Sequence, residues 1–277
     1  MHHSRGHHIL QFDFPVPPMK PSCRDIFLVS LLCSASFLQS GLCREVVVRG
    51  GTLQESAGLG AVSVSSFFMS QFRVSSDEWQ TVQAWAAQNG YQITRLQPGD
   101  PGNLTAKNMS WYDALKWCNA KSQMHGLTPV YTVSGANYKR GCFVPVMNEG
   151  ASGYRLPSLA EWVWAASGGR MSKGCRINEN NQVEDDAWYD RNMRPSDHTV
   201  IKVPNRLGLY DMSGYNSNGN RGEWCWEFGE PQYSTRRIWH ANWWDSIAVG
   251  LTASYPIYKY PDLRGHGLGF RTVRKSH

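Results

Sequence analysis

The chain has 277 residues, of which 41% are hydrophobic, 12% aromatic and 18% charged, an ordinary globular composition with unusually many Trp. This length fits one large domain or two small ones. The formal net charge of +6 is spread along the chain. Its only basic cluster, Arg236 and Arg237, is too small for a nucleic-acid-binding stripe, so no nucleic-acid partner is expected.

The N-terminal region is interpreted as a targeting segment. Lys20 and Arg24 follow Met19, and an apolar run extends from Ile26 to Leu38. This run is shorter than the ~20 apolar residues of a membrane-spanning helix, but it is typical of a signal peptide. We therefore predict a signal peptide over residues 19–42, preceded by a leader of doubtful status over residues 1–18.

Cys43 follows this segment directly and resembles the lipidated Cys of a bacterial lipobox. Lipidation there would attach the protein to a membrane through several acyl chains, because one chain binds only marginally. The expected location is the bacterial cell envelope, as a surface-exposed outer-membrane lipoprotein. Leu42 departs from the small residue usual before such a Cys. Plain secretion and an uncleaved anchor are therefore alternatives.

Cys23 and Cys33 fall in the predicted signal peptide, and the cysteines after Cys43 are Cys118, Cys142, Cys175 and Cys225. Four cysteines allow three pairings, and their spacing does not choose among them. None has the CxxC spacing of a zinc site. Cys118 and Cys225 are predicted to be buried thiols, because each lies among apolar residues.

Short β-branched runs split by Gly predict strands, with a linker, over residues 43–66. A first helix is predicted to begin at Ser75 and to end at Gly90, with Trp79 and Val82 at helical spacing. A second helix is predicted between the N-cap Ser110 and Gly126. One buried face of this helix is formed by Trp111, Ala114, Leu115 and Cys118.

Leu127 to Val144 is predicted as a strand pair around a polar loop. A capping box of Ser158 and Glu161 predicts a third helix over residues 159–166, which stops at the following pair of glycines. Three helices, many short strands and long loops predict an α+β domain.

The segment from Arg237 to Arg274 is rich in Trp, Tyr and His and has neither helical nor strand periodicity over most of its length. Its last residues, GFRTVR, predict a final strand. Tyr and Trp offer large rigid contact areas, so this segment is predicted to be a ligand-binding surface. Tyr258 and Tyr260 are expected to be exposed, whereas Trp239 and Trp243 have the alternative of lying in the core.

Five segments together resemble the formylglycine-generating-enzyme-like family, also called sulfatase-modifying factors. They are MSWYDALKWCNAKSQMHGLTPVY, YRLPSLAEWVWAASGG, PNRLGLYDMSG, GNRGEWCWEF and GFRTVR, in the family's order. The resemblance implies a C-type-lectin-like fold with two to three helices, short antiparallel strands and many loops. It implies a domain over residues 67–277, with residues 237–274 as its variable ligand-binding region.

Enzymes of this family oxidise a sulfatase Cys with a pair of reactive Cys, which would follow the segment Trp239 to Trp243. The sequence has no Cys after Cys225, and neither a thiolate oxidation nor a copper–thiolate site can form without thiolates. No catalytic residue is therefore expected. A sulfatase-modifying oxidase and an invariant envelope binding protein are the alternative functions.

The C-terminal segment is also similar to the variable proteins of diversity-generating retroelements. Their pattern matches Trp243, Ala248, Pro261-Asp262-Leu263-Arg264 and Gly269-Phe270-Arg271. The resemblance implies a macromolecular ligand, such as a protein, bound by substituted side chains between these fixed positions. The implied positions are Trp239, His240, Asn242, Trp244, Asp245, Ser246, Ile247, Gly250, Tyr255, Ile257, Tyr258, Lys259, Tyr260, Leu263, Gly265, His266, Gly267 and Leu268.

A structural calcium ion is the one cofactor considered. Asn220, Gly222 and Glu223 align with a calcium loop of the family, and hard oxygen ligands suit Ca²⁺. Arg221 and an insertion before the loop favour a plain turn instead. His198, His240 and His266 share no spacing typical of a triad or a metal site.

Overall fold

The computed structural model describes residues 45–53, 60–96, 105–169, 204–212, 222–228, 237–240, 256–264 and 268–276. The predicted leader, signal peptide and lipidation site at Cys43 lie outside these ranges. No helix within them is long and apolar enough to cross a membrane.

The first and last described strands lie in one sheet. β1 (Glu45–Val48) pairs antiparallel with β4 (Phe67–Ser70), which pairs on its other edge with β11 (Val273–Lys275). β2 (Gly51–Leu53) and β3 (Val62–Val64) form a separate antiparallel pair. The early strands are thus present. β1 is hydrogen-bonded to β4, within one compact unit that extends from Cys43 to His277.

Local capping signals set the ends of the first two helices. α2 (Ser76–Gln88) begins where the Ser75 side chain accepts a hydrogen bond from the Glu78 amide, and α3 (Trp111–Met124) begins in the same way at Ser110. Gly90 and Gly126 follow these helices with φ angles of 82° and 70°, a conformation that favours glycine. Both predicted helices are confirmed.

The third predicted helix is also confirmed, as α4 (Leu159–Ala166). Both hydrogen bonds of the capping box are present, from the Glu161 amide to Ser158 and from the Ser158 amide to Glu161. The Glu161 carboxylate also binds the guanidinium of Arg155 at 2.6 and 2.7 Å. This ion pair fixes the chain as it enters α4.

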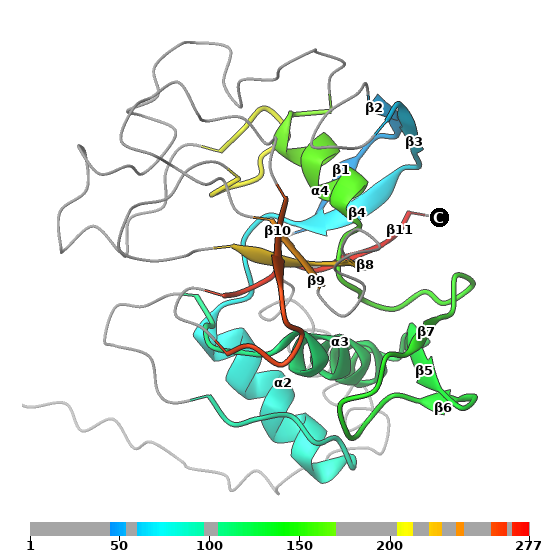
Figure 1. The fold of residues 1–277 in the computed structure, drawn as a ribbon, viewed down its shortest axis with the longest axis vertical. Helices are drawn as coiled ribbons and strands as arrows, with labels where there is room; N and C mark the ends of the chain where they lie inside the picture. The colour runs from blue at the N-terminus through cyan, green and yellow to red at the C-terminus, as the bar shows by residue number, and fades with distance from the viewer. Residues whose placement is uncertain are drawn as a thin grey trace, which may run out of the picture. The chain divides into compact units, whose positions relative to one another are not determined.

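A small sheet lies beside α3 (Figure 1). β5 (Tyr131–Val133) pairs with β6 (Ala136–Asn137) across a turn of Ser134 and Gly135, both with positive φ, and with β7 (Val146–Met147) on its other edge. The predicted strand pair therefore lies partly elsewhere, because its second partner begins only after Val144. The chain leaves the sheet in between, since the Tyr138 hydroxyl and the Lys116 ammonium bind Gly141 O.

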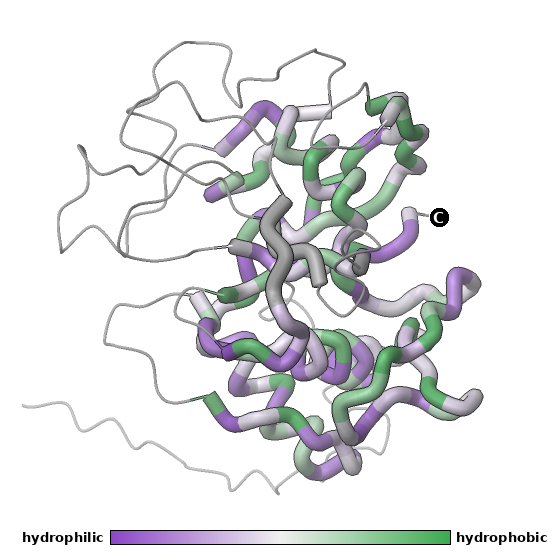
Figure 2. The backbone as a smooth tube through the Cα atoms, in the orientation of Figure 1, coloured by the Kyte–Doolittle hydropathy of each residue, from purple (hydrophilic) through white to green (hydrophobic). Residues whose placement is uncertain are grey.

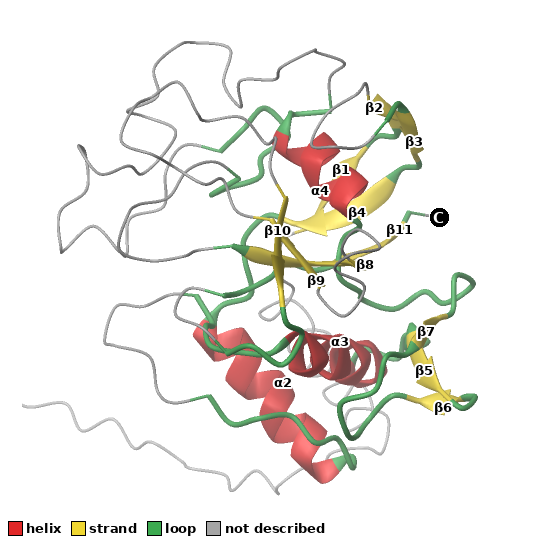
Figure 3. Cartoon of the chain, in the orientation of Figure 1, coloured by secondary structure: helices red, strands yellow, loops and turns green. Residues whose placement is uncertain are grey.

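The strands separate two hydrophobic cores. In Figures 1 and 3, β4, β8 (Glu223–Phe228) and β11 lie between α4 and the pair α2 and α3. Neighbouring residues of β8 point to opposite sides: Trp224 packs in the core of α2 and α3, and Cys225 in that of α4. The two sides differ in composition. In Figure 2, α4 is mostly hydrophobic, whereas α2 contains both hydrophilic and hydrophobic residues.

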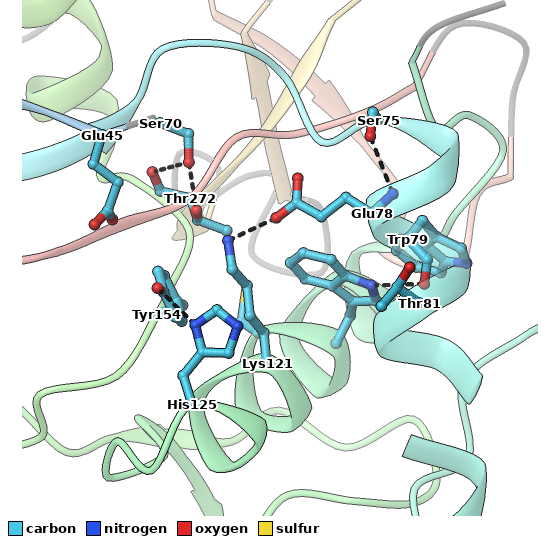
Figure 4. Close-up of polar contacts among 12 residues, drawn as sticks. Glu45, Ser70, Ser75, Glu78, Trp79, Thr81, Lys121, His125, Tyr154 and Thr272 are labelled. Atoms are coloured by element: carbon cyan, nitrogen blue, oxygen red, sulfur yellow. Dashed lines mark hydrogen bonds and ion pairs between the residues drawn. The ribbon is translucent and has the colours of Figure 1, made fainter. Parts of the chain in front are cut away.

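Polar contacts connect the elements around α3 (Figure 4). The Lys121 ammonium of α3 lies 2.7 Å from the Glu78 carboxylate of α2 and 4.1 Å from the centre of the Tyr154 ring. The Ser70 and Thr272 hydroxyls are 2.6 Å apart where β4 meets the C-terminal strand region. Lys121 is almost fully buried, and these partners compensate the cost of burying its charge.

Candidate ligand-binding surface

The C-terminal segment contains two strands that its sequence pattern does not predict. β9 (Arg237–His240) pairs antiparallel with β10 (Pro256–Lys259), so that Trp239 lies opposite Ile257. β9 also pairs with β8 along its other edge. The expected irregular backbone is therefore wrong for these two stretches. β9 becomes a strand because β8 pairs along one of its edges, and β10 becomes a strand because it pairs along the other edge of β9.

The structure describes the backbone or side chains of some predicted contact positions but not of others. Trp239 and His240 lie in β9, and Ile257, Tyr258 and Lys259 in β10. Tyr260, Leu263 and Leu268 are described with their side chains. The remaining predicted positions lie outside the described residues: Asn242, Trp244, Asp245, Ser246, Ile247, Gly250, Tyr255, Gly265, His266 and Gly267.

After β10 the chain forms a turn that exposes two apolar side chains. The Leu263 amide donates a hydrogen bond to Tyr260 O at 3.0 Å. Tyr260 is 53% exposed, as predicted, and Leu263 is 38% exposed. The carbonyl of Pro261 accepts a hydrogen bond from the Trp111 amide at 2.9 Å. This bond connects the turn, residues 260–264, to the N-terminus of α3.

An ion pair holds the same turn on α3. Arg264 Nη1 lies 3.0 Å from Asp113 Oδ2, and the Asp113 side chain is almost completely buried. Asp113 also accepts hydrogen bonds from the Ser110 hydroxyl at 2.8 Å and the Thr94 amide at 3.3 Å. Its other oxygen lies 3.5 Å from the Lys116 ammonium. Both oxygens of the carboxylate therefore have partners, and the contact with Arg264 holds the turn against the helix.

The fixed positions Gly269, Phe270 and Arg271 pack into the interior. The Phe270 ring meets Trp79 and Trp117 edge to face, with centroids 6.1 and 5.4 Å away. A Cβ at Gly269 would lie 2.6 Å from the Arg73 guanidinium and 3.1 Å from Ala106 O, so only glycine fits there without a shift. These contacts explain why the pattern requires a small residue before an aromatic one.

Arg271 is fully buried and pairs with Glu223. Its Nε and Nη2 atoms each lie 2.8 Å from one carboxylate oxygen, and Nη2 also donates to Tyr210 O. Burial alone would raise the pKa of Glu223, but the charge of Arg271 and its hydrogen bonds, aided by Arg73, hold that pKa below its ordinary value. Glu223 is therefore a buried anion that connects β8 to the C-terminal chain.

One predicted contact position is placed in the core. Leu268 is only 2% exposed and packs in the cluster formed by α2, α3 and Phe270. The expectation that Leu268 contacts ligand from an exposed position is therefore wrong. It immediately precedes Gly269, whose amide and carbonyl bond Gly222 and Trp224, and this pairing directs the chain inward.

Two of the residues suggested for calcium, Gly222 and Glu223, are bound by arginine side chains of the chain itself. Glu223 lies between the guanidinium groups of Arg271 and Arg73, and it accepts a hydrogen bond from the Trp162 indole at 2.9 Å. Gly222 O accepts from Arg73. Asn220 lies outside the described residues. Within the described ranges, no group of three His, Cys, Asp or Glu is placed to hold a metal ion.

The cysteine predictions are confirmed where they are described. Cys118 and Cys225 are buried, and Cys142 is free and exposed. Burial raises the pKa of the Cys118 thiol well above its ordinary value, which disfavours the reactive thiolate. Cys175 lies outside the described residues.

Sequence reasoning did not identify Asp113 as a partner of the C-terminal segment. The contact with Arg264 spans a long stretch of chain, and no local pattern signals it. A buried acidic residue on the apolar side of a helix, next to Ala114 and Leu115, is the one available hint that a cation had to reach it.

Comparisons with known proteins agree with this architecture. A family model described as the sulfatase-modifying factor enzyme 1-like domain matches residues 37–276. The Chaperone protein LppX of Paenibacillus barcinonensis is 30% identical over 266 residues, which cover 83% of this chain and 89% of that protein.

Two solved structures are similar in fold. The structure titled CarF superposes with a TM-score of 0.65 at 30% identity, over 85% of this chain and 99% of that one. Treponema denticola variable protein 1 gives a TM-score of 0.63 at 23% identity, over 84% and 95%. The expected α+β fold of the formylglycine-generating-enzyme type, with its short antiparallel strands, is thereby confirmed.

Proposed function

We propose that this chain, which belongs to the sulfatase-modifying factor enzyme 1-like family, is a non-catalytic protein that binds a macromolecular ligand through residues 237–274. The side chains of this region are diversified by a retroelement while the backbone is kept. The protein is a lipoprotein of the bacterial envelope, anchored through Cys43 and displayed at the surface.

The observation that carries this proposal is the different placement of fixed and variable positions. Arg264, Phe270 and Arg271 are each held by specific contacts with the scaffold. Tyr260 and Leu263, which lie just before Arg264, are exposed. Such a surface exchanges the side chains of Tyr260 and Leu263 without repacking the core, because these side chains lie outside both hydrophobic cores.

The thiols support a non-catalytic function. The sequence has no Cys from residue 226 to residue 277, where the family's reactive pair would follow Trp239 to Trp243. Cys225 is fully buried, in the core beside α4. A thiol in that position has no access to a peptide substrate.

The test is genetic. A diversified gene has a nearby imperfect repeat of codons 237–274 beside a reverse transcriptase gene, and the two copies differ only at adenines of the repeat. Sequencing of the gene from a growing population should then show changes at the codons of Tyr260 and Leu263 but not at those of Phe270 and Arg271. Absence of the repeat, or changes spread evenly over both sets, would contradict the proposal.

Enzymatic activity is tested separately. The purified chain should leave the Cys of a sulfatase peptide unchanged, as followed by mass spectrometry under air with and without added copper. Formylglycine production would favour the oxidase instead.

The anchor is tested by metabolic labelling with palmitate. The wild type and Cys142→Ser, which removes an exposed Cys of the folded domain, should incorporate label, whereas Cys43→Ser should not. Equal labelling of all three proteins would refute lipidation at Cys43.

A further inference from the structure

Exposed apolar side chains gather on two segments. Among the described residues, the large hydrophobic side chains classed as exposed are Val47 and two groups: Phe143, Val144 and Val146 at 51–70%, and Tyr260 and Leu263 at 53% and 38%. Phe143 and Val144 lie in the loop between β6 and β7, Val146 is the first residue of β7, and the second group lies in the turn after β10. Only the second group belongs to the region proposed to vary.

Both segments are attached to the same part of α3. Lys116 donates a hydrogen bond to Gly141 O at 3.2 Å and lies 3.5 Å from Asp113 Oδ1. Asp113 Oδ2 in turn lies 3.0 Å from Arg264. One carboxylate and one ammonium, a single helical turn apart, therefore join loop 141–146 to turn 260–264. The two segments are thus held by neighbouring residues on one turn of α3.

Loop 141–146 is held in a defined conformation although its apolar side chains are exposed. The Tyr138 hydroxyl donates to Gly141 O at 2.8 Å and accepts from the Phe143 amide at 3.3 Å. Gly141 has a φ of 77°, and a Cβ there would lie 2.5 Å from the Phe143 ring. Phe143 therefore packs over Gly141 and is presented with little freedom left to lose on binding.

We propose that loop 141–146 and turn 260–264 form one docking surface, on which the loop is a constant contact for a protein ligand. This inference rests on the proposed function and deepens it. Phe143, Val144 and Leu263 offer no hydrogen bonds, so they favour apolar side chains of a protein over the hydroxyls of a glycan. Arg264, 39% exposed at its side chain, and the Tyr260 hydroxyl supply polar contacts at the edge.

A constant contact has a consequence for ligand choice. The loop lies outside residues 237–274, so diversification leaves Phe143 and Val144 unchanged. Every variant then retains one apolar half of the surface, and changes in the other half select among proteins that present an apolar protrusion. Exposed, rigid apolar residues of this kind otherwise cost solubility and mark interaction sites.

The experiment uses the soluble domain, residues 43–277, and a phage-displayed library of random linear peptides as the probe. Binders are selected on the wild type. Their affinities are then measured for Phe143→Ser/Val144→Ser, for Tyr260→Ser/Leu263→Ser and for Val47→Ser. The last removes an apolar residue of similar exposure from β1. Because all five residues are exposed, thermal melts should be unchanged.

We expect enriched peptides to contain apolar residues and to lose roughly tenfold or more in affinity with either double variant, but not with Val47→Ser. Loss with Tyr260→Ser/Leu263→Ser alone would overturn the constant contact and leave the proposed function standing. Loss with Phe143→Ser/Val144→Ser alone would instead place binding outside the variable region and contradict both. Failure to enrich any peptide, or enrichment of peptides that bind all variants equally, would overturn the docking surface.

Discussion

At the scale of single residues, Glu223 determines how the C-terminal chain enters the core. Its two oxygens are both bound by Arg271, with Trp162 and Arg73 close by. Both partners are removed from water, so the pair is costly to form and more costly to break. The same carboxylate that aligns with a calcium ligand in sequence is thus the counterion of a guanidinium.

Glu223→Gln should lower the free energy of unfolding by about 3–5 kcal/mol, because it leaves Arg271 buried without an anion. Urea denaturation at neutral pH measures this loss. Glu45→Gln, which breaks the more exposed pair with Arg274, should cost no more than about 1 kcal/mol. Equal effects of the two substitutions would show that the buried pair contributes no more to stability than the more exposed pair does.

This pair also gives a pH dependence with a definite sign. The pKa of Glu223 is lower in the folded chain than in the unfolded one, so its stabilising contribution is complete above the unfolded value of about 4.3. The contribution is lost as pH falls through the lower, folded value. The difference between wild type and Glu223→Gln should therefore shrink in acid and stay constant between neutral and mildly alkaline pH.

At the scale of elements, local sequence signals are sufficient to predict the helices but not to predict which strands form the sheets. Ser75, Ser110 and Ser158 each cap a helix within a few residues of the predicted start. No local signal predicts β9 and β10, because β9 is stabilised by pairing with β8, and β10 by pairing with β9. The same limit hid the Asp113–Arg264 contact and the burial of Leu268, which depend on partners far along the chain.

Asp113→Asn tests whether α3 positions the turn at residues 260–264. Loss of the charge removes the ion pair with Arg264, and we expect about 1–3 kcal/mol of destabilisation. Hydrogen exchange should quicken at the Trp111 amide, which donates to Pro261. Asp77→Asn, at an exposed position in the first turn of α2, should leave that amide unchanged. Unaltered protection of Trp111 in Asp113→Asn would refute the positioning role.

Glu227 connects β8 to the start of α4, because its carboxylate accepts a hydrogen bond from the Leu159 amide at 2.8 Å. Burial raises its pKa to about 7. The folded chain therefore binds this proton more tightly than the unfolded chain does. Stability should fall as pH rises from about 4.3 to 7 and should level off above that.

Glu227→Gln removes this titration and keeps a hydrogen-bond acceptor. Relative to wild type, the variant should gain on the order of 2 kcal/mol between pH 5 and 8, judged from the size of the shift and reduced for partial exposure. Thermal melts across this range measure the gain. Parallel profiles for the two proteins would show that Glu227 titrates normally.

At the scale of the whole molecule, the fold separates a scaffold from a surface along the same short stretch of chain. Two cores lie on either side of the strands, and the segment from residue 268 to residue 273 contributes to both through Phe270 and Val273. Residues 260–264 instead lie against the end of α3 with their apolar side chains outward. The sequence pattern predicted the exposure of Tyr260 but placed the buried Leu268 among the contact positions, because a stretch without periodicity gives no reason to bury it.

A matched pair of substitutions measures this separation. Leu268→Ala removes a side chain that is 2% exposed in the core of α2 and α3, and it should destabilise the fold by about 2–5 kcal/mol. Leu263→Ala removes the same atoms from a side chain that is 38% exposed, and it should change stability by no more than about 0.5 kcal/mol. Chemical denaturation of both variants compares them directly. Similar losses of stability would mean that Leu263 is part of the scaffold. Turn 260–264 would then not contain replaceable positions beside constant ones. If Leu268→Ala is much more destabilising than Leu263→Ala, position 268 must remain apolar in any diversified copy of the protein. Position 263 can then accept every side chain.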